Sequence, residues 1–312
     1  MPTPLRILSL LPSATEVVCA LGLRDALVGR SHECDYPPGV EELPFCTEPK
    51  IDVHGSSHEI HQQIEKLLGA SLSVYRVDAA KLRDLQPTHI VTQVQCEVCA
   101  VSLGDVEAAL SDWADSRPRI VALNPRSLED CFSDIERAAG ALGTPSRGAS
   151  LVGALRRRMI AISKGTRSVL VRPRVASIEW LSPLMAAGNW IPQLVEMAGG
   201  ESLFGEPGQH SPWLDWDALL AGDPDFILLV PCGFSLPRIR EEIPLLAADP
   251  HWRKLRAVRE GGVFLCDGNQ YFNRPGPRLV ESLEIMAEIL HPEIFGFGHE
   301  GSGWERLRQA QE

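Results

Sequence analysis

The sequence lacks any long uninterrupted apolar segment and any run rich in lysine and arginine. A membrane-spanning helix needs about 20 consecutive apolar residues, so we expect no membrane insertion. The densest basic stretch is Arg156–Arg158, in a chain whose formal net charge is -11. An acidic chain without a larger basic cluster is disfavoured as a partner of nucleic acid or of an anionic membrane surface.

Short motifs typical of common enzymes are also absent. The chain contains no Gly-x-Ser-x-Gly, no phosphate-binding loop, no Gly-x-Gly-x-x-Gly after a strand and no His-Glu-x-x-His. The sequence therefore gives little support to catalysis.

No signal peptide is evident at the N-terminus. Pro12 and Glu16 interrupt the apolar stretch there, and no clear small-residue cleavage site follows it. We therefore expect a cytoplasmic protein whose eight cysteines are mostly reduced thiols. A periplasmic location would require that a leader has been lost from this sequence.

Helical and apolar extended segments alternate along the chain, which predicts an α/β fold with mainly parallel sheets. The two halves follow a similar plan: a strand, a turn with serine and proline, and a helix closed by glycine. The first copy has a strand at 5–11, a turn at Pro12-Ser13 with Ser13 or Thr15 capping the helix, and a helix end near Gly22. The second copy has a strand at 174–180, a turn at Ser182-Pro183 and a helix at 191–200. Further strands are predicted at 119–123 and 262–266.

One long helix is predicted between the halves, because apolar residues at 151, 152, 155, 159 and 162 have helical spacing. The expected fold is two α/β lobes joined by this long rigid helix, with a ligand cleft between the lobes. The expected boundaries are 5–145 for the first lobe, 146–166 for the helix, 167–291 for the second lobe and 292–312 for a loosely held tail.

Open α/β sheets bind ligands beyond the carboxyl ends of their strands, so the loops that follow the predicted strands are the candidate site. Such loops hold polar, thiol and aromatic residues in both halves, and a rigid Pro-Gly-Pro turn follows the last of them. The candidate ligand-binding residues are Ser13, Gln95, Cys96, Glu97 and Cys99 in the first half, and Glu179, Trp180, Cys232, Tyr271, Phe272, Asn273 and Arg274 in the second.

The Cys-x-x-Cys at Cys96 and Cys99 has several interpretations. With His32 and Cys34 it would supply the number and type of ligands of a tetrahedral zinc site. A redox pair is disfavoured because the acidic neighbour Glu97 raises thiol pKa. Thiols packed around a turn, or thiols lining a ligand pocket, remain alternatives.

Several blocks, in this order and spacing, resemble the helical-backbone periplasmic-binding-protein family, and within it the cobalamin (vitamin B12) binding type. They are "RILSLLPSATEVVCALGL", "HECDYPP", the joining helix, "EWLSPLMAAGNWIPQLVEMAGG" and "FNRPGPRL", and they cover about residues 5–291. The resemblance implies two lobes joined by a rigid helix, with a corrinoid or other metal chelate bound between them. It also implies that Tyr36, the loop at 93–97, Trp180 and the stretch Tyr271–Arg274 face the ligand.

The chain looks like a leaderless, cysteine-bearing subgroup with an added amphipathic helix around 51–75. We therefore expect a substrate-binding protein of the ABC-transporter type that holds a cobalamin-like corrinoid or another metal chelate. Its partner would be an ABC importer or a corrinoid-handling protein. The alternatives are a soft-metal protein holding a zinc or copper ion through His32, Cys34, Cys96 and Cys99, and a thiol-dependent enzyme acting on a small molecule.

Overall fold

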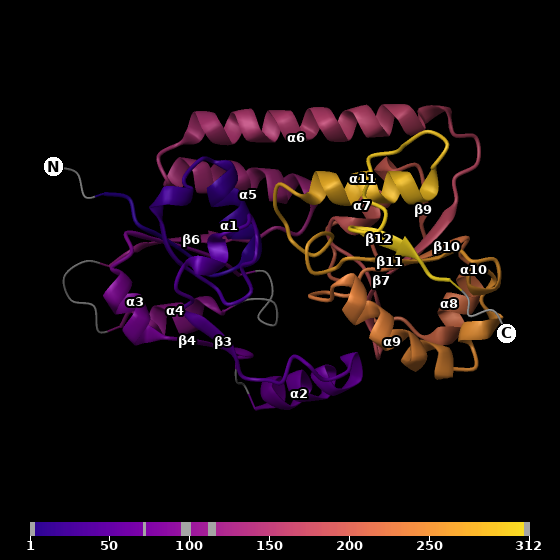
Figure 1. Ribbon diagram of the computed structural model, residues 1–312, viewed down its shortest axis with the longest axis horizontal. Coiled ribbons are helices and arrows are strands. Elements are labelled where there is room, and N and C mark those ends of the chain that lie inside the picture. The colour runs from indigo at the N-terminus through magenta and orange to yellow at the C-terminus, as the bar shows by residue number, and fades with distance from the viewer. Residues whose placement is uncertain (1–3, 71–72, 95–100, 112–116, 309–312) are drawn as a thin grey trace. The chain divides into compact units, whose positions relative to one another are not determined.

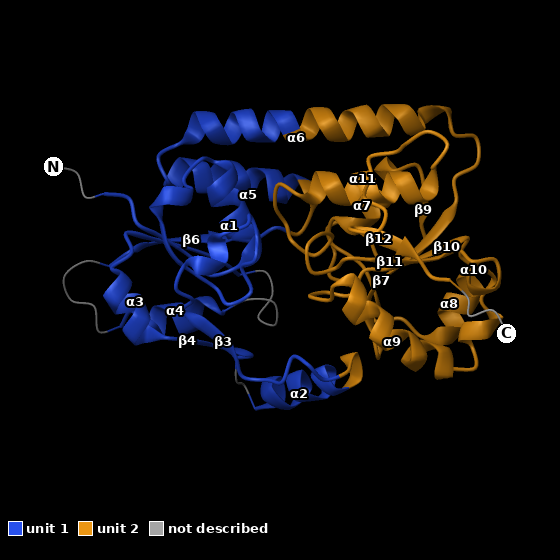
Figure 2. Ribbon diagram, viewed as in Figure 1, with its two compact units in different colours: residues 1–55, 59–125, 129–154 blue, residues 56–58, 126–128, 155–312 orange. Residues whose placement is uncertain are grey.

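The structure, a computed structural model, describes residues 4–70, 73–94, 101–111 and 117–308. It divides into two compact units, each described by itself below (Figure 2). Unit 1 comprises Met1–Gly55, Glu59–Pro125 and Glu129–Ala154, and unit 2 comprises Ser56–His58, Arg126–Leu128 and Leu155–Glu312. Among the described residues, every helix is too short or too polar to cross a bilayer.

Unit 1 contains a parallel sheet with the strand order β2-β1-β5-β6. Its strands are β1 (Ile7–Ser9), β2 (Leu27–Arg30), β5 (His89–Gln93) and β6 (Arg119–Leu123). A separate antiparallel pair is formed by β3 (Thr47–Pro49) and β4 (Tyr75–Val77). The parallel sheet and the predicted strand at 119–123 are confirmed.

The helices of unit 1 follow the strands, as expected for an α/β unit (Figure 1). They are α1 (Pro12–Ala20), α3 (Ala79–Leu85), α4 (Leu103–Ala109) and α5 (Leu128–Ala141), with short 3₁₀ turns η1 (Arg24–Ala26) and η2 (Val40–Glu42). The expected turn at Pro12-Ser13 is wrong, because α1 already begins at Pro12 and neither Ser13 nor Thr15 caps it. A proline is well suited to the first helical position, where its missing N–H costs no hydrogen bond.

Helix α2 (Ser57–Gly69) confirms a helix in the segment around 51–75. Its first residues belong to unit 2 and the rest belong to unit 1. The helix is amphipathic: Ile60 is buried, while His61 and Glu65, one turn apart, pair at 3.3 Å on a more exposed face.

Unit 2 contains a mixed sheet with the order β12-β11-β10-β7-β8, and β9 (Glu201–Ser202) pairs with β7. The central strands β7 (Arg174–Leu181), β10 (Phe226–Leu229) and β11 (Val263–Cys266) are parallel neighbours. The expected α/β class with mainly parallel sheets is therefore confirmed in both units.

Strand β8 (Leu184–Ala186) was not predicted from the sequence. The chain turns at Ser182-Pro183 as expected, but it then runs back antiparallel to β7 before a helix forms. The helices of unit 2 are α7 (Ile191–Met197), α8 (Trp216–Gly222), α9 (Leu236–Ala248), α10 (Arg256–Arg259) and α11 (Leu279–Leu290), with 3₁₀ turns η3 (Thr166–Ser168) and η4 (Trp252–Lys254).

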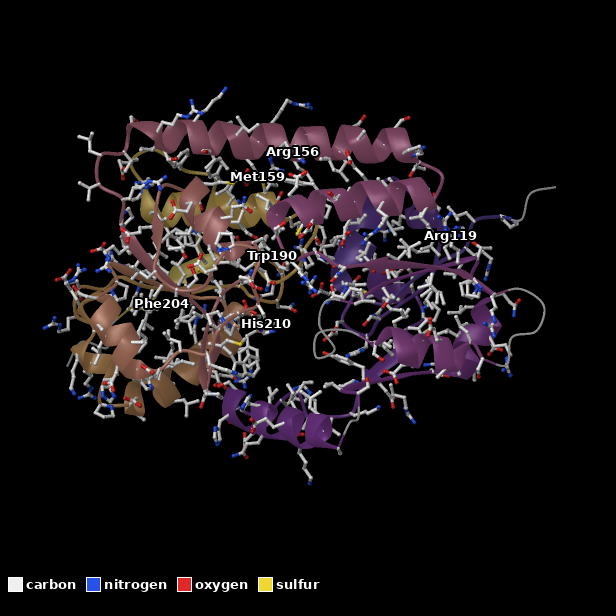
Figure 3. All side chains as sticks on the ribbon, turned by 180° about the vertical axis from the view of Figure 1, so that it is seen from behind. Arg119, Arg156, Met159, Trp190, Phe204 and His210 are labelled. Carbon is white, nitrogen blue, oxygen red and sulfur yellow. The ribbon has the colours of Figure 1, made fainter. Side chains whose placement is uncertain are left out.

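The predicted joining helix is confirmed as α6 (Pro145–Gly165), and the boundary between the units falls within it. Val152, Leu155, Met159 and Ile162 are buried along one face, at the three- and four-residue spacing that predicted the helix. Met159 and the less buried Arg156 are labelled in Figure 3.

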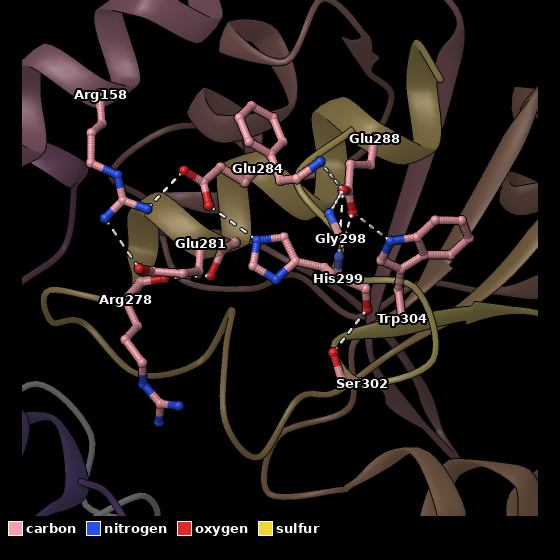
Figure 4. A network of polar contacts seen from close by, with 11 residues as sticks. Arg158, Arg278, Glu281, Glu284, Glu288, Gly298, His299, Ser302 and Trp304 are labelled. Atoms are coloured by element: carbon pink, nitrogen blue, oxygen red, sulfur yellow. Dashed lines mark hydrogen bonds and ion pairs between the residues drawn. The ribbon is translucent and has the colours of Figure 1, made fainter. Parts of the chain in front are cut away.

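The segment after Pro292 is not loosely held in its described part. Strand β12 (Trp304–Arg306) pairs antiparallel with β11. The buried carboxylate of Glu288, on α11, accepts hydrogen bonds from the backbone N–H groups of residues 297–299 and, at 3.0 Å, from Trp304 Nε1 (Figure 4). These contacts fix the segment onto α11 and the sheet.

The same network contains an ion pair that depends on pH (Figure 4). His299 Nε2 lies 3.0 Å from Glu284 Oε2, and Arg158 Nη2 lies 2.7 Å from Glu284 Oε1. Burial opposes ionisation of Glu284, but the hydrogen bond from His299 and the Arg158 guanidinium hold its pKa below the usual range. The hydrogen bond to Glu284 raises the pKa of His299 against the opposing effect of burial.

We predict that His299→Gln destabilises the protein at acidic pH more than at alkaline pH. A histidine whose pKa is higher in the folded than in the unfolded protein stabilises the folded state. This stabilisation is complete below the pKa of the unfolded state, about 6.5, and is lost as the pH rises through the pKa of the folded state. A carboxyl group such as Glu284, whose pKa is lower in the folded protein, stabilises the folded state above about pH 4.3. It loses this effect as the pH falls through its pKa in the folded state. Urea unfolding of His299→Gln should therefore show a free energy of unfolding lower by about 1 kcal/mol at pH 5.5, and this difference should shrink toward pH 8.5.

The control is His54→Gln, because His54 is exposed, and it should be as stable as the wild type at both pH values. An equal loss of stability for His299→Gln at both pH values would contradict the account.

Candidate ligand site

The end of β7 and the loops after β10 and β11 meet at one edge of the sheet of unit 2, because these strands are parallel neighbours. Their backbones are hydrogen-bonded to one another. Cys232 N donates to Glu179 O at 3.2 Å, and Gly268 N donates to Phe234 O at 3.0 Å. Gly233 N in turn donates to Gly268 O at 3.3 Å. The structure thus brings Cys232 next to Glu179, which with Trp180 lies in the last part of β7, at the carboxyl end of the strand.

The loop after β11 is fixed to the loop after β10 by the side chain of Asn273. Its Nδ2 donates to Val230 O at 2.9 Å and to Gly268 O at 3.1 Å. Gly268 itself lies so close to Pro231 that a Cβ atom would collide with the Pro231 carbonyl. Asn273 therefore serves to hold the two loops together, whatever contact it makes with a ligand.

Trp180 is a partly buried aromatic side chain at this edge. Its ring lies 5.4 Å from the ring of Phe234 at an interplanar angle of 58°. Its Nε1–H is buried and has no acceptor within the described part of the chain. A buried donor without an acceptor costs about 1–3 kcal/mol, which makes this group a candidate for a hydrogen bond to a ligand.

Glu179, next to Trp180, is a partly buried carboxyl group. Ser211 Oγ donates to its Oε2 at 2.9 Å and accepts from Gly188 N at 3.0 Å. Burial raises the pKa of Glu179, against the hydrogen bond from Ser211. The sequence offered no signal for Ser211, since it lies in a loop far from the predicted strand ends.

The residues of the stretch Tyr271–Arg274 differ in burial and in their contacts, so they do not form one ligand-facing surface. Phe272 is 0% exposed, and its carbonyl accepts from Trp190 Nε1 at 2.6 Å (Trp190 is labelled in Figure 3), so it belongs to the core. The buried Arg274 donates from Nη2 to Asn269 Oδ1 at 3.2 Å. Tyr271 is partly buried, with the guanidinium carbon of Arg278 5.2 Å from its ring centroid. A ligand-facing position is thus disfavoured for Phe272.

In unit 1, the candidates Ser13 and Tyr36 differ in exposure. Ser13 is buried in the first turn of α1, and within the described residues its Oγ has no hydrogen-bond partner. Tyr36, in the loop after β2, is 39% exposed. Gln95, Cys96, Glu97 and Cys99 lie outside the described residues.

The other two predicted metal ligands already have protein partners. The buried Cys34 Sγ accepts from Thr15 Oγ1 at 3.0 Å, and His32 Nδ1 lies 2.8 Å from Thr47 Oγ1. Burial lowers the pKa of His32. Within the part of the chain that the structure describes, no three His, Cys, Asp or Glu side chains are grouped so as to hold a metal ion. The set His32, Cys34, Cys96 and Cys99 therefore stays a prediction.

Several described cysteines are poor nucleophiles. Burial raises the pKa of Cys46 to about 11 and also raises the pKa of Cys19, Cys131 and Cys266. Because the thiolate is the reactive form, thiol chemistry at these residues is disfavoured at neutral pH.

Comparison with known proteins decides the family. The family model described as "Periplasmic binding protein" matches residues 7–270, most of the chain. The chain belongs to the periplasmic binding protein family. The resemblance inferred from its sequence blocks is confirmed, and the description of the family is that of a binding protein.

Several known proteins match nearly the whole chain. The "Vitamin B12-binding protein" of Photorhabdus laumondii is 22% identical over 92% of this chain and 88% of its own length. The "Uncharacterized ABC transporter substrate-binding lipoprotein YvrC" of Bacillus subtilis is 21% identical over 94% and 82%. In fold, the chain is similar to a periplasmic heme-binding protein from Pseudomonas aeruginosa, with a TM-score of 0.74, 18% identity and coverage of 99% and 100%.

We predict that Gly268→Ala destabilises this binding protein by about 2 kcal/mol or more, because the new methyl group meets backbone that cannot rotate away. The matched control is Gly296→Ala, where a Cβ would meet nothing within 4 Å. Urea unfolding at neutral pH measures both variants. If the two variants were equally stable, the close approach of the loops after β10 and β11 would be wrong.

Proposed function

We propose that this chain is the substrate-binding protein of an ABC importer and that its ligand is a corrinoid, with cobalamin the first compound to test. The family match supports the binding role. The names of the Photorhabdus laumondii and Bacillus subtilis relatives support the corrinoid and the importer.

The observation that carries the ligand class is Trp180 at the strand-end edge of unit 2. Its flat ring has a partly exposed surface, and its Nε1–H is an unpaired donor among the described residues. Covering about 50 Å² of apolar ring by a flat macrocycle would contribute about 1.3 kcal/mol at about 25 cal/mol per Å². An amide oxygen on the rim of a corrinoid would be a suitable acceptor for the indole N–H.

Glu179 favours a corrinoid over heme as the ligand. An ionised Glu179, the residue before Trp180 in β7, would repel a second carboxylate, and heme carries two carboxylates, whereas the rim of cobalamin carries mostly uncharged amides.

We predict that Trp180→Ala weakens cobalamin binding roughly tenfold, which corresponds to about 1.4 kcal/mol. The measurement is a titration followed by visible absorbance and by calorimetry, with cobalamin, cobinamide and hemin as ligands. The matched control is Trp213→Ala, which removes a tryptophan of the same unit that is 61% exposed. This control should bind like the wild type.

Failure of the wild type to bind any corrinoid would overturn the proposal. If hemin bound instead, the ligand would be a heme and the argument from Glu179 would be wrong. The predicted contact of Cys96 and Cys99 with the ligand stays a prediction. The double variant Cys96→Ser/Cys99→Ser tests it in the same titration, together with analysis of the purified protein for zinc and copper.

A further inference from the structure

The N-terminal turn of α2 is anchored in unit 2 by a buried carboxylate. Ser57 is 0% exposed, and its backbone N–H lies 3.2 and 3.1 Å from Glu242 Oε1 and Oε2, while its Oγ donates to Oε2 at 2.6 Å. Glu242, on α9, is itself 2% exposed. A carboxylate that accepts from the first N–H of a helix pairs a donor that has no acceptor within the helix, and it complements the positive end of the helix dipole.

A second contact lies beside this anchor. His58 Nδ1 lies 3.4 Å from the hydroxyl oxygen of Ser182, in the turn that directly follows β7. The first turn of α2 therefore touches both α9 and the turn that closes the strand of Trp180.

From Glu242, contacts continue along α9 to the candidate ligand site. Arg238 Nη2 donates to Glu242 Oε1 at 2.8 Å, and the Arg238 guanidinium carbon lies 4.6 Å from the centroid of the Phe234 ring. Phe234 then contacts Trp180. Ser57, Glu242, Arg238, Phe234 and Trp180 thus form one continuous series of contacts within unit 2.

Trp180 is sensitive to this series because no hydrogen bond fixes its indole. Its Nε1–H has no acceptor among the described residues, so packing sets the orientation of the ring. The position of the Arg238 guanidinium over Phe234 in turn depends on the charge of the buried Glu242, since a guanidinium–carboxylate hydrogen bond is stronger than one to a neutral amide.

We propose that Ser57, Glu242 and Arg238 are positioning residues that hold Trp180, through Phe234, in the orientation that receives the ligand. The contact between Trp180 and the ligand rests on the proposed function, whereas the orientation of the Trp180 ring does not. It gives the α2 segment a part in ligand binding without any contact between α2 and the ligand.

The first test needs no ligand. The chain has seven tryptophans, and the indole ¹H–¹⁵N signal of Trp180 is identified by its loss in Trp180→Phe. Glu242→Gln should shift this signal. The matched control is Glu241→Gln, because Glu241 also pairs with Arg238, at 3.1 Å, but is exposed. A Trp180 signal that stays in place in Glu242→Gln, or moves equally in both variants, overturns the inference.

The second test measures coupling to the ligand by a double-mutant cycle. Glu242→Gln should weaken cobalamin binding about three- to fivefold in the wild type and by less than about 1.5-fold in Trp180→Ala. Equal losses in both backgrounds would overturn the inference and leave the proposed function intact. If the wild type bound no corrinoid, the proposed function would fail and the indole signal would still decide the positioning role.

A milder pair of variants covers the case in which Glu242→Gln does not fold. Ser57→Ala removes the 2.6 Å hydrogen bond and keeps the backbone N–H, whereas Ser57→Thr keeps both. Ser57→Ala should shift the Trp180 signal and weaken cobalamin binding about twofold, and Ser57→Thr should restore both. If Ser57→Ala matched the wild type in both measurements, α2 would have no positioning role.

Discussion

The candidate site in unit 2 depends on the close contact between the backbone of the loop after β11 and that of the loop after β10. At Gly268 the backbones of the two loops approach so closely that no side chain fits between them. The side chain of Asn273 donates hydrogen bonds to a carbonyl group in each loop. Because the strands before these loops are parallel neighbours, the contact also brings the end of β7 alongside, through Cys232 and Glu179. The position of Trp180 relative to the other loops follows from this backbone arrangement rather than from any one side chain.

Much of the fold could be predicted because it depends on local patterns. Helix α6 and strands β6 and β11 follow from apolar spacing and from the proline and glycine residues that flank them. Strand β8 was missed because three residues are too few to show a period of two. The segment after Pro292 was expected to be loose from its glycine content, but its order comes from Glu288 and Trp304, a contact between distant residues that composition does not reveal.

The neighbours within the candidate site could be predicted where they depend on strand ends but not where they depend on packing. Glu179, Trp180 and Cys232 could be placed at one edge because they lie at or just after the ends of parallel strands, whose carboxyl ends share that edge. Phe272 was included for its aromatic ring, although it is buried in the core. Ser211 and Phe234, which contact Glu179 and Trp180, were missed because these contacts are tertiary. For Phe234, the one available signal was its position two residues after Cys232, in the same loop.

The central claim is that the strand-end edge of unit 2 receives the ligand, and hydrogen exchange with and without cobalamin tests it most directly. The account predicts slower exchange in peptides covering 179–190, 230–235 and 267–278, and unchanged exchange in 299–308, which is fixed to α11 and the sheet in either state. Binding of cobalamin that left those three segments unchanged and protected only other parts of the chain would contradict it.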